Sequence, residues 1–315
     1  MPVRLRIGSR PSALALAQAG IVRSALAALI PGLDSEIVRI KTTGDRMTSA
    51  SLASAGGKGL FIKELEQALA DRQIDIAVHS MKDLPATVAP GFRIAAVPER
   101  EDPRDALVTR AAGGLDALPR AARIGTSSAR RKFEVIRLRP DLIVSPLRGN
   151  VDTRLERLAK GELDGIILAI AGLKRLSRLD GLNHHALDER EFVPAGGQGA
   201  LAIEAVESTP IAGSRDVERA LADLNDTRAS AETAAERAFL AGIGASCESP
   251  VGVHAVLEAG ALSVRVRLFS IDGSTELADS ISEHCDSSPV SAAAVGSRLA
   301  RRMLERGAAA LIGGK

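Results

Sequence analysis

The sequence predicts an α/β fold of two similar lobes that enclose a cleft, followed by a small α+β domain. Strand-like and helix-like segments alternate through the first two thirds of the chain, as is typical of α/β proteins. This pattern then restarts, because residues 123–127 (RIGTS) echo residues 6–10 (RIGSR), and residues 162–168 (ELDGIIL) echo residues 73–78 (QIDIAV). From about Asn225 onward, the pattern changes to one helix, two strands and a closing helix.

Each element has a local signal in the sequence. Residues 5–7 (LRI) are expected to form a strand, and residues 12–29 an Ala/Leu helix with Ser12 as a candidate N-cap. The other expected strands are 36–41, 74–78, 93–97, 201–203, 251–257 and 262–269, and the other expected helices are 61–70, 229–240 and 292–305.

The connections between these elements suggest where the domains begin and end. The charged, Pro-containing segment 99–103 is a candidate hinge, and the Gly-rich segment 194–199 is a candidate second crossing. The expected domains are a first lobe of residues 1–99 and 199–221, a second lobe of 104–193, and an α+β domain of 225–315. Ligands of open α/β sheets bind beyond the carboxyl ends of the strands, so the cleft is the expected binding site.

Composition argues against several classes of function. The net charge of +2, the absence of Trp and Tyr, and only six Phe count against a nucleic-acid binder. Five scattered His lack zinc-ligand spacing, so no metal is expected. Two cysteines are too few for a disulfide framework, and neither a signal peptide nor an 18-residue apolar run is evident. We therefore expect a cytoplasmic protein with no nucleic-acid or membrane partner.

The most informative motif is residues 79–85 (HSMKDLP), which follows the apolar run 74–78. It places Lys82 and Asp83 at the end of a buried strand, and Pro85 stops regular structure there. A carboxylate at a strand's carboxyl end suits proton transfer or stabilisation of a cation. The alternative is an ordinary strand exit with a solvated Lys-Asp pair.

Arginine placement favours an anion site. Only eight of the 41 basic residues are lysine, a bias that genome composition could also produce. Several arginines, however, lie between a short apolar run and a helix-like segment. Guanidinium groups and the free N–H groups of helix N-termini together form carboxylate or phosphate sites. The arginines in such places are Arg10, Arg130, Arg131, Arg148 and Arg154.

The glycine-rich segments and the cysteines have competing interpretations. Residues 56–59 (GGKG) lack P-loop spacing and favour a mobile loop over a phosphate cradle. Residues 196–199 (GGQG) precede no helix and favour a turn or hinge over a dinucleotide site. Cys247 lies in a loop of small residues, so its thiol is either neutral surface or reactive. Cys285 is interpreted as packing or surface.

These motifs, taken in order, resemble the porphobilinogen deaminase (hydroxymethylbilane synthase) family along essentially the whole chain. The matching blocks are 8–10 (GSR), 43–45 (TGD), 56–61 (GGKGLF), 79–85 (HSMKDLP), 99–105 (EREDPRD), 125–131 (GTSSARR), 147–154 (LRGNVDTR), 171–175 (AGLKR), 197–200 (GQGA) and 247–252 (CESPVG).

The resemblance implies a fold, a cofactor and a reaction. The fold has two lobes like those of periplasmic binding proteins and a third domain, which carries a dipyrromethane cofactor on a thioether to Cys247. The implied enzyme is a transferase that joins four porphobilinogen molecules head to tail onto this primer, with loss of ammonia. Hydrolysis then releases hydroxymethylbilane for tetrapyrrole (haem) biosynthesis. The resemblance also implies a monomer with this small-molecule substrate.

Single residues acquire implied roles in the same way. Asp83 is the implied catalytic residue. The implied cofactor contacts are Cys247, Lys82, Asp83, Ser128, Arg130 and Arg131. The implied substrate contacts are Arg10, Ser12, Lys58, Phe61, Arg148, Arg154 and Arg175. Numerous arginines suit this chemistry, because each pyrrole carries an acetate and a propionate.

The sequence departs from the family pattern in two segments. In the cysteine loop, residues 245–250 (ASCESP), the family usually has Gly before the cysteine. Glu248 follows the cysteine where the family usually has an uncharged residue, and it could raise the pKa of the Cys247 thiol and slow cofactor attachment. Gly196 replaces a usual Val and could loosen that crossing. The alternatives from other functional classes are a non-catalytic carboxylate-binding protein and a phosphate-transferring enzyme, the second of which would need nucleotide binding. Cys247 and the lack of a signal peptide count against the first.

Overall fold

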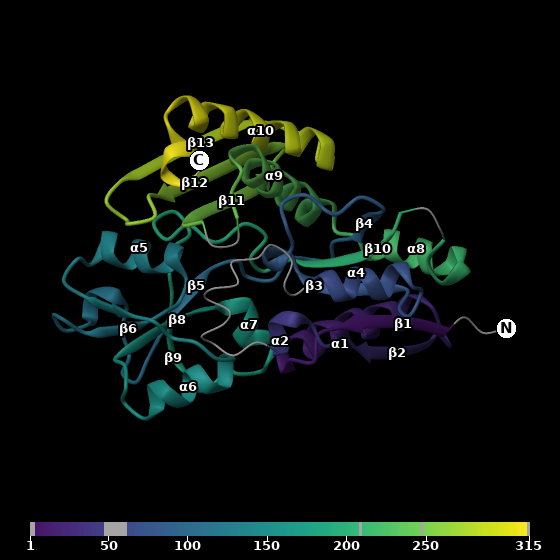
Figure 1. Ribbon diagram of the computed structural model, residues 1–315, viewed down its shortest axis with the longest axis horizontal. Coiled ribbons are helices and arrows are strands. Elements are labelled where there is room, and N and C mark those ends of the chain that lie inside the picture. Colours follow the sequence, from purple (N-terminus) through teal and green to yellow (C-terminus); the bar gives the residue numbers. More distant parts are fainter. Residues whose placement is uncertain (1–3, 47–61, 208–209, 247–248, 314–315) are drawn as a thin grey trace. The chain divides into compact units, whose positions relative to one another are not determined.

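The computed structural model describes residues 4–46, 62–207, 210–246 and 249–313 (Figure 1). The chain forms two compact units, each assembled from two separate segments. The first unit comprises Met1–Arg100 and Ala200–Ser230, and the second comprises Glu101–Gly199 and Ala231–Lys315. Within the described residues, every helix is too short or too polar to cross a membrane.

The first unit contains a five-stranded sheet in the order β2-β1-β3-β10-β4. Strand β1 pairs in parallel with β2 and β3, and β10 runs antiparallel to β3 and β4. The strands are β1 (Arg4–Ser9), β2 (Asp34–Arg39), β3 (Ile76–Ser80), β4 (Phe92–Ala96) and β10 (Leu201–Val206). The helices are α1 (Ala13–Leu29), α2 (Thr43–Arg46), α4 (Lys63–Ala70) and α8 (Arg215–Leu224), with the 3₁₀ turns η1 (Met81–Asp83) and η3 (Ile211–Gly213).

Helix α1 begins where the sequence predicts. The Ser12 side chain accepts a hydrogen bond from the Ala15 N–H at 3.3 Å, which satisfies one of the free donors of the first turn. The helix then buries Val22 and Leu26 in the same core as Ile7 of β1. Each such side chain contributes about 1.5–3 kcal/mol when fully buried. This packing fixes the start of α1 beside the carboxyl end of β1.

The second unit contains a matching five-stranded sheet in the order β7-β6-β8-β5-β9. Strand β6 pairs in parallel with β7 and β8, and β5 runs antiparallel to β8 and β9. The strands are β5 (Asp105–Thr109), β6 (Arg123–Gly125), β7 (Ile143–Ser145), β8 (Gly165–Ala169) and β9 (Asn183–Ala186). The helices are α5 (Ala129–Leu138), α6 (Val151–Ala159) and α7 (Ile170–Arg175), with the 3₁₀ turn η2 (Leu115–Ala117).

The sequence echo between the lobes has a structural cause. The Arg6 N–H donates to the Asp75 carboxylate at 2.7 Å, and the Arg123 N–H donates to the Asp164 carboxylate at the same distance. Each aspartate N–H donates back to the arginine carbonyl, at 2.8 and 2.9 Å. In the first lobe these bonds join β1 to the residue just before β3. In the second lobe the same bonds join β6 to the residue just before β8. The prediction of two similar α/β lobes is confirmed.

The C-terminal part of the second unit is a three-stranded antiparallel sheet packed against helices. Its strands are β11 (Val251–Glu258), β12 (Ala261–Phe269) and β13 (Glu276–His284). Its helices are α10 (Pro289–Glu305), α11 (Ala308–Leu311) and α9 (Thr227–Ile243), which belongs to the first unit up to Ser230. Strand β13 was not predicted, because its sequence, ELADSISEH, is mostly polar. Cys285 follows it and is 2% exposed, so the packing interpretation is correct. The α/β fold class with an α+β C-terminal part is confirmed, whereas the three-domain boundaries stay a prediction.

Two chain crossings meet inside the second unit. The Glu101 N–H donates to the Gly199 carbonyl at 3.3 Å, and the Gln198 amide donates to the Pro103 carbonyl at 2.7 Å. These residues flank the points where the chain passes from one unit to the other, at 100–101 and 199–200. Both segments were predicted as crossings, and the bonds hold them side by side.

Gly196 lies nearby in this second crossing. A Cβ added there would lie 2.7 Å from the Leu240 side chain and 2.8 Å from the Val253 side chain. These two neighbours, from α9 and β11, therefore occupy the space that a valine side chain would need. The expected loosening of the crossing stays a prediction.

We expect Gly199→Ala to destabilise the protein markedly. Gly199 has φ +90°, and an added Cβ would lie 2.2 Å from the Glu101 carbonyl oxygen, a backbone atom that cannot rotate away. The cost should exceed about 2 kcal/mol of unfolding free energy, from conformational strain and collision together. Urea unfolding measures it. The control is Gly20→Ala inside α1, where nothing lies within 4 Å and about 1 kcal/mol of stabilisation is expected. An unchanged midpoint for Gly199→Ala would contradict this reading of the crossing.

Candidate functional site

Asp83 stands on a short, firmly anchored turn. Strand β3 is buried at its first four positions, and η1 follows it directly. The Met81 N–H donates to the Ala200 carbonyl at 3.0 Å, and both Met81 and Leu84 are buried. Asp83 lies between these anchors with its side chain exposed. The strand-end position predicted for this carboxylate is therefore the observed one. Lys82, beside it, is half-buried.

Asp83 lines a small cavity in the first unit together with Arg10 and Ser12. Arg10 follows β1, and its guanidinium donates to the Asp45 carboxylate, with the Nη2–Oδ1 distance 2.6 Å. Burial alone would raise the pKa of Asp45, but hydrogen bonds from Arg10 and Thr42 outweigh burial and hold this pKa below its usual value. Asp45 thus stays ionised and keeps Arg10 at the cavity that Asp83 lines.

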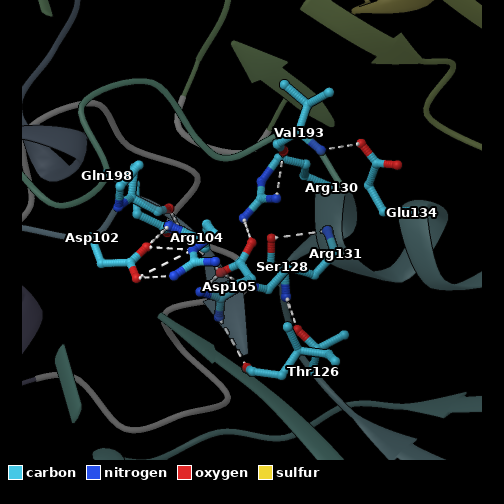
Figure 2. Close-up of polar contacts among 12 residues, drawn as sticks. Asp102, Arg104, Asp105, Thr126, Ser128, Arg130, Arg131, Glu134, Val193 and Gln198 are labelled. Atoms are coloured by element: carbon cyan, nitrogen blue, oxygen red, sulfur yellow. Dashed lines mark hydrogen bonds and ion pairs between the residues drawn. The ribbon is translucent and has the colours of Figure 1, made fainter. Parts of the chain in front are cut away.

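The second unit holds a buried pair of arginines (Figure 2). Helix α5 follows β6, and its N-cap Ser128 accepts from the Arg131 N–H at 3.4 Å. Arg130 and Arg131, in the first turn, both point to Asp105, the first residue of β5. Arg130 Nη2 lies 2.8 Å from Asp105 Oδ2, and Arg131 Nη2 lies 2.6 Å from Oδ1. Gln198 donates to the same Oδ1 at 3.0 Å.

This cluster carries more positive than negative charge. Burial would raise the pKa of Asp105, but the two guanidinium groups hold it well below its usual range. Burial lowers the pKa of Arg131, and Asp105 offsets this only in part. The pKa of Arg154 is lowered by burial and then by repulsion from Arg131, so these cations lie near each other. Two arginines bonded to one carboxylate, with a third arginine close to Arg131, suit a further anion such as a carboxylate.

The remaining predicted arginines lie at the ends of other elements in the second unit. Arg148 follows β7 and is exposed. Arg154, in α6, donates to the Gly149 carbonyl at 2.8 Å. Arg175, the last residue of α7, donates to the Gly199 carbonyl at 2.5 Å, and burial lowers its pKa. Arg175 is thereby bonded to the second crossing.

The structure brings the predicted residues together in two groups. Arg10, Ser12 and Asp83 share the cavity of the first unit. Ser128, Arg130 and Arg131 share the first turn of α5, with Arg154 close enough to Arg131 to repel it electrostatically. Predicted residues that lie outside the described part of the chain are Lys58, Phe61 and Cys247, together with Glu248.

Sequence reasoning assigned no role to Asp45, Asp105 or Gln198, although each stands in a motif block. A local signal exists for Asp105 itself, because it directly precedes the apolar residues 106–108 (ALV), which the structure shows to be buried. A charged residue at such a position needs a partner of opposite charge. Asp45 and Gln198 carry no comparable signal, since their partners come from distant parts of the sequence.

Comparison with known proteins adds independent findings. The family model "Porphobilinogen deaminase, dipyromethane cofactor binding domain" matches residues 5–211, and "Porphobilinogen deaminase, C-terminal domain" matches residues 230–305. Among solved structures, the probable amino-acid ABC transporter extracellular-binding protein ytmK from Bacillus subtilis has TM-score 0.42 and 11% identity. That alignment covers 70% of this chain and 90% of that chain.

Curated relatives match over nearly the full length. The porphobilinogen deaminase of Sulfurimonas denitrificans is 44% identical over 312 residues, covering 98% of this chain and 96% of that protein. That of Sorangium cellulosum is 47% identical, covering 87% and 89%, respectively. That of Roseiflexus sp. strain RS-1 is 44% identical and covers 100% of both chains. With both family models and these relatives aligned along its length, the chain belongs to the porphobilinogen deaminase family.

Proposed function

We propose that Asp83 is the catalytic carboxylate of this porphobilinogen deaminase and that arginines of both lobes bind the carboxylates of its pyrrole rings. The family's activity is the formation of hydroxymethylbilane in tetrapyrrole biosynthesis, and residues 5–211 match its dipyrromethane-binding domain. One observation carries the residue assignment: Asp83 lines a single cavity with Arg10 and Ser12. A carboxylate thus stands beside a cation that can hold the substrate's own carboxylates.

The exposed position of Asp83 suits this role. Loss of ammonia from porphobilinogen leaves positive charge on the substrate's pyrrole and its methylene carbon. A carboxylate fixed nearby can accept a hydrogen bond from the pyrrole N–H and stabilise that charge. Because Met81 and Leu84 anchor the turn, little reorganisation is needed to present Asp83. The cleft expected between the lobes stays a prediction.

The donor set of the second unit fits a polycarboxylate such as dipyrromethane. When bound, this group supplies a terminal pyrrole carbon that is nucleophilic toward the substrate. Arg130, Arg131 and Arg154 would hold its acetate and propionate groups by charge-assisted hydrogen bonds, and the start of α5 offers backbone N–H groups beside them. Ser128 and Lys82 are further proposed contacts. The proposed covalent anchor is Cys247, and the proposed effect of Glu248 is slower attachment.

We also propose a cytoplasmic monomer. Two cysteines in 315 residues, with Cys285 buried as a free thiol, suit a reducing compartment, where a thiol at position 247 would stay available. Porphobilinogen is the small-molecule substrate of the family. Analytical ultracentrifugation at assay concentration should give one species of 32.8 kDa plus the cofactor, and a dimer mass would contradict the proposal.

Arg148→Lys should be severe although the charge is kept. Lysine offers a compact point charge where a planar fork is expected to bind a carboxylate through two bonds. We expect kcat/KM for porphobilinogen to fall about tenfold or more, the equivalent of losing about 1.4 kcal/mol or more of binding. Arg110→Lys is the control, because Arg110 is also an exposed arginine of the second unit but lies outside the motif blocks, and its guanidinium forms a 3.7 Å ion pair with Asp164. Equal losses in the two variants would overturn the assignment of Arg148.

A further inference from the structure

Both carboxylate oxygens of Asp105 accept hydrogen bonds from side chains that are themselves held in place by other bonds. It is 0% exposed and accepts from Arg130, Arg131 and Gln198. Arg131 gives both Nε and Nη2 to Oδ1, at 3.0 and 2.6 Å. A lone buried carboxylate costs several kcal/mol in desolvation, so its presence requires these partners.

The far side of each guanidinium is fixed as well. Arg130 Nη1 donates to the Val193 carbonyl at 2.8 Å, and Arg131 Nη1 donates to the Ile167 carbonyl at 3.1 Å. The Val193 N–H in turn donates to the buried Glu134 carboxylate at 3.2 Å (Figure 2). Arg130 is thus bonded through two guanidinium nitrogens and Arg131 through all three, which leaves each group one orientation. Its remaining N–H bonds point in set directions.

We infer that Asp105 is a positioning residue for the dipyrromethane site, because it fixes the directions in which Arg130 and Arg131 present their remaining N–H donors. The inference rests on the proposed role of these arginines in cofactor binding. Gln198 supports the arrangement, since its amide bonds Asp105 and the Pro103 carbonyl together, at 3.0 and 2.7 Å. Asp105 is therefore fixed to the same crossing that carries Gly199.

The first unit repeats this device on a smaller scale. Arg10 is bonded to Asp45 through Nε and Nη2, and Asp45 is held in turn by the N–H and hydroxyl of Thr42, at 3.1 and 2.8 Å. A buried or nearly buried aspartate behind a ligand-binding arginine thus occurs in both lobes. Each aspartate partly cancels the positive charge that would attract an anion, so charge alone does not explain why both lobes have one. The repeat therefore favours a role in orienting the arginines.

Charge and orientation predict opposite results for Asp105→Asn. The variant removes one negative charge from the cluster, so a purely electrostatic site would attract the anionic cofactor more strongly. If Asp105 positions the arginines, the variant binds more weakly despite the added positive charge, because an amide nitrogen would face a guanidinium. The sign of the change therefore separates the two roles, and a general loss of stability is measured independently.

The experiment follows the two-pyrrole mass on the intact chain. Adduct-free wild type, Asp105→Asn and Asp75→Asn are incubated with porphobilinogen at several concentrations, and the rate of mass gain is measured. Asp75→Asn is the matched control, since Asp75 also accepts several bonds from one arginine, Arg6, in a different part of the chain. Circular dichroism and thermal melting report on folding.

We expect Asp105→Asn to gain the adduct roughly 10- to 100-fold more slowly, the range found when partners that orient metal ligands are removed. Higher porphobilinogen should partly restore its rate, and Asp75→Asn should load as wild type does. Loading by folded Asp105→Asn at or above the wild-type rate would overturn the inference, as would an equal loss in Asp75→Asn. If Asp105→Asn does not fold, Gln198→Met decides: slower loading supports the inference, and an unchanged rate overturns it.

A further variant separates this inference from the proposed function. Arg131→Lys keeps the charge but removes the planar guanidinium group that is hydrogen-bonded to Asp105. If Arg131→Lys loads normally, the proposed role of the arginine pair fails. If Arg131→Lys loads slowly while Asp105→Asn loads normally, the arginine role stands and only the inference about Asp105 fails.

Discussion

Asp83→Asn is expected to keep its fold and lose nearly all turnover. Asparagine matches aspartate in shape, and the turn is anchored by Met81 and Leu84 rather than by the Asp83 side chain. The amide cannot supply the negative charge that a cationic substrate species needs. Loss of one preorganised electrostatic contact typically costs about 100- to 1000-fold in kcat. The loss of kcat is measured from porphobilinogen consumption and hydroxymethylbilane release, on protein whose intact mass confirms the cofactor adduct.

A matched control is available on the second lobe. Asp116 is also an exposed aspartate in a 3₁₀ turn, η2, next to a buried leucine, Leu115. Asp116→Asn should therefore leave turnover unchanged while making the same chemical change. Near-normal turnover by folded Asp83→Asn would refute the catalytic assignment. If Asp116→Asn lost as much turnover as Asp83→Asn, the cause would be the change in net charge and not the position of Asp83 in the cavity.

Cys247→Ser is expected to yield a chain without cofactor. A thiolate is a strong, soft nucleophile that can form a stable thioether, whereas a serine hydroxyl is a weak nucleophile at neutral pH. Without the anchored primer, the first substrate has no pyrrole carbon to join, so turnover should vanish. The arginines of α5 would also lack the cofactor carboxylates that they are proposed to bind, and repulsion between them would be uncompensated. The variant should therefore melt at a lower temperature than the loaded enzyme.

Cys285→Ser provides the control for this substitution. Cys285 is a buried free thiol after β13, so serine there buries a hydroxyl at a cost of about 1–3 kcal/mol without touching the cofactor. Intact mass should show the same two-pyrrole adduct on wild type and Cys285→Ser and none on Cys247→Ser. An adduct that persists on Cys247→Ser, or that disappears from folded Cys285→Ser, would show that the anchor was misassigned.

Local signals made much of the architecture predictable. The apolar runs before residues 8 and 125, the capping serine at position 12 and the strand before Asp83 each depend on residues close in sequence. The echo between lobes also had a local cause, since the same Arg–Asp backbone bonds recur in both. The strand-end position of Asp83 was also predictable, because the apolar run 74–78 and Pro85 lie close to it in sequence, whereas its catalytic role stays a proposal.

The features that could not be predicted depend on partners far away in sequence. Strand β13 has alternating polar residues, and only its pairing with β12 makes it a strand. Asp105 meets Gln198 across 93 positions, so no local pattern signals the bond. Asp45, the partner of Arg10, lies in the motif block 43–45 (TGD), and nothing in the sequence indicates that these two residues form an ion pair. Tertiary contacts, rather than propensity, decide each of these cases.

The place of β10 in the first sheet has a consequence for how this protein is made. Strand β10 pairs with both β3 and β4, yet it is encoded after the whole of the second lobe. At about 5–20 residues per second, the ribosome needs roughly 5–20 s to add the roughly 100 intervening residues. During that time the first lobe has no β10, and the hydrogen-bonding edges of β3 and β4 stay open to wrong partners. Closing so long a loop costs about 4 kcal/mol in chain entropy. The nascent chain is therefore most exposed to misassembly while its second lobe is being synthesised, and a chaperone that shields strand edges would act in that interval.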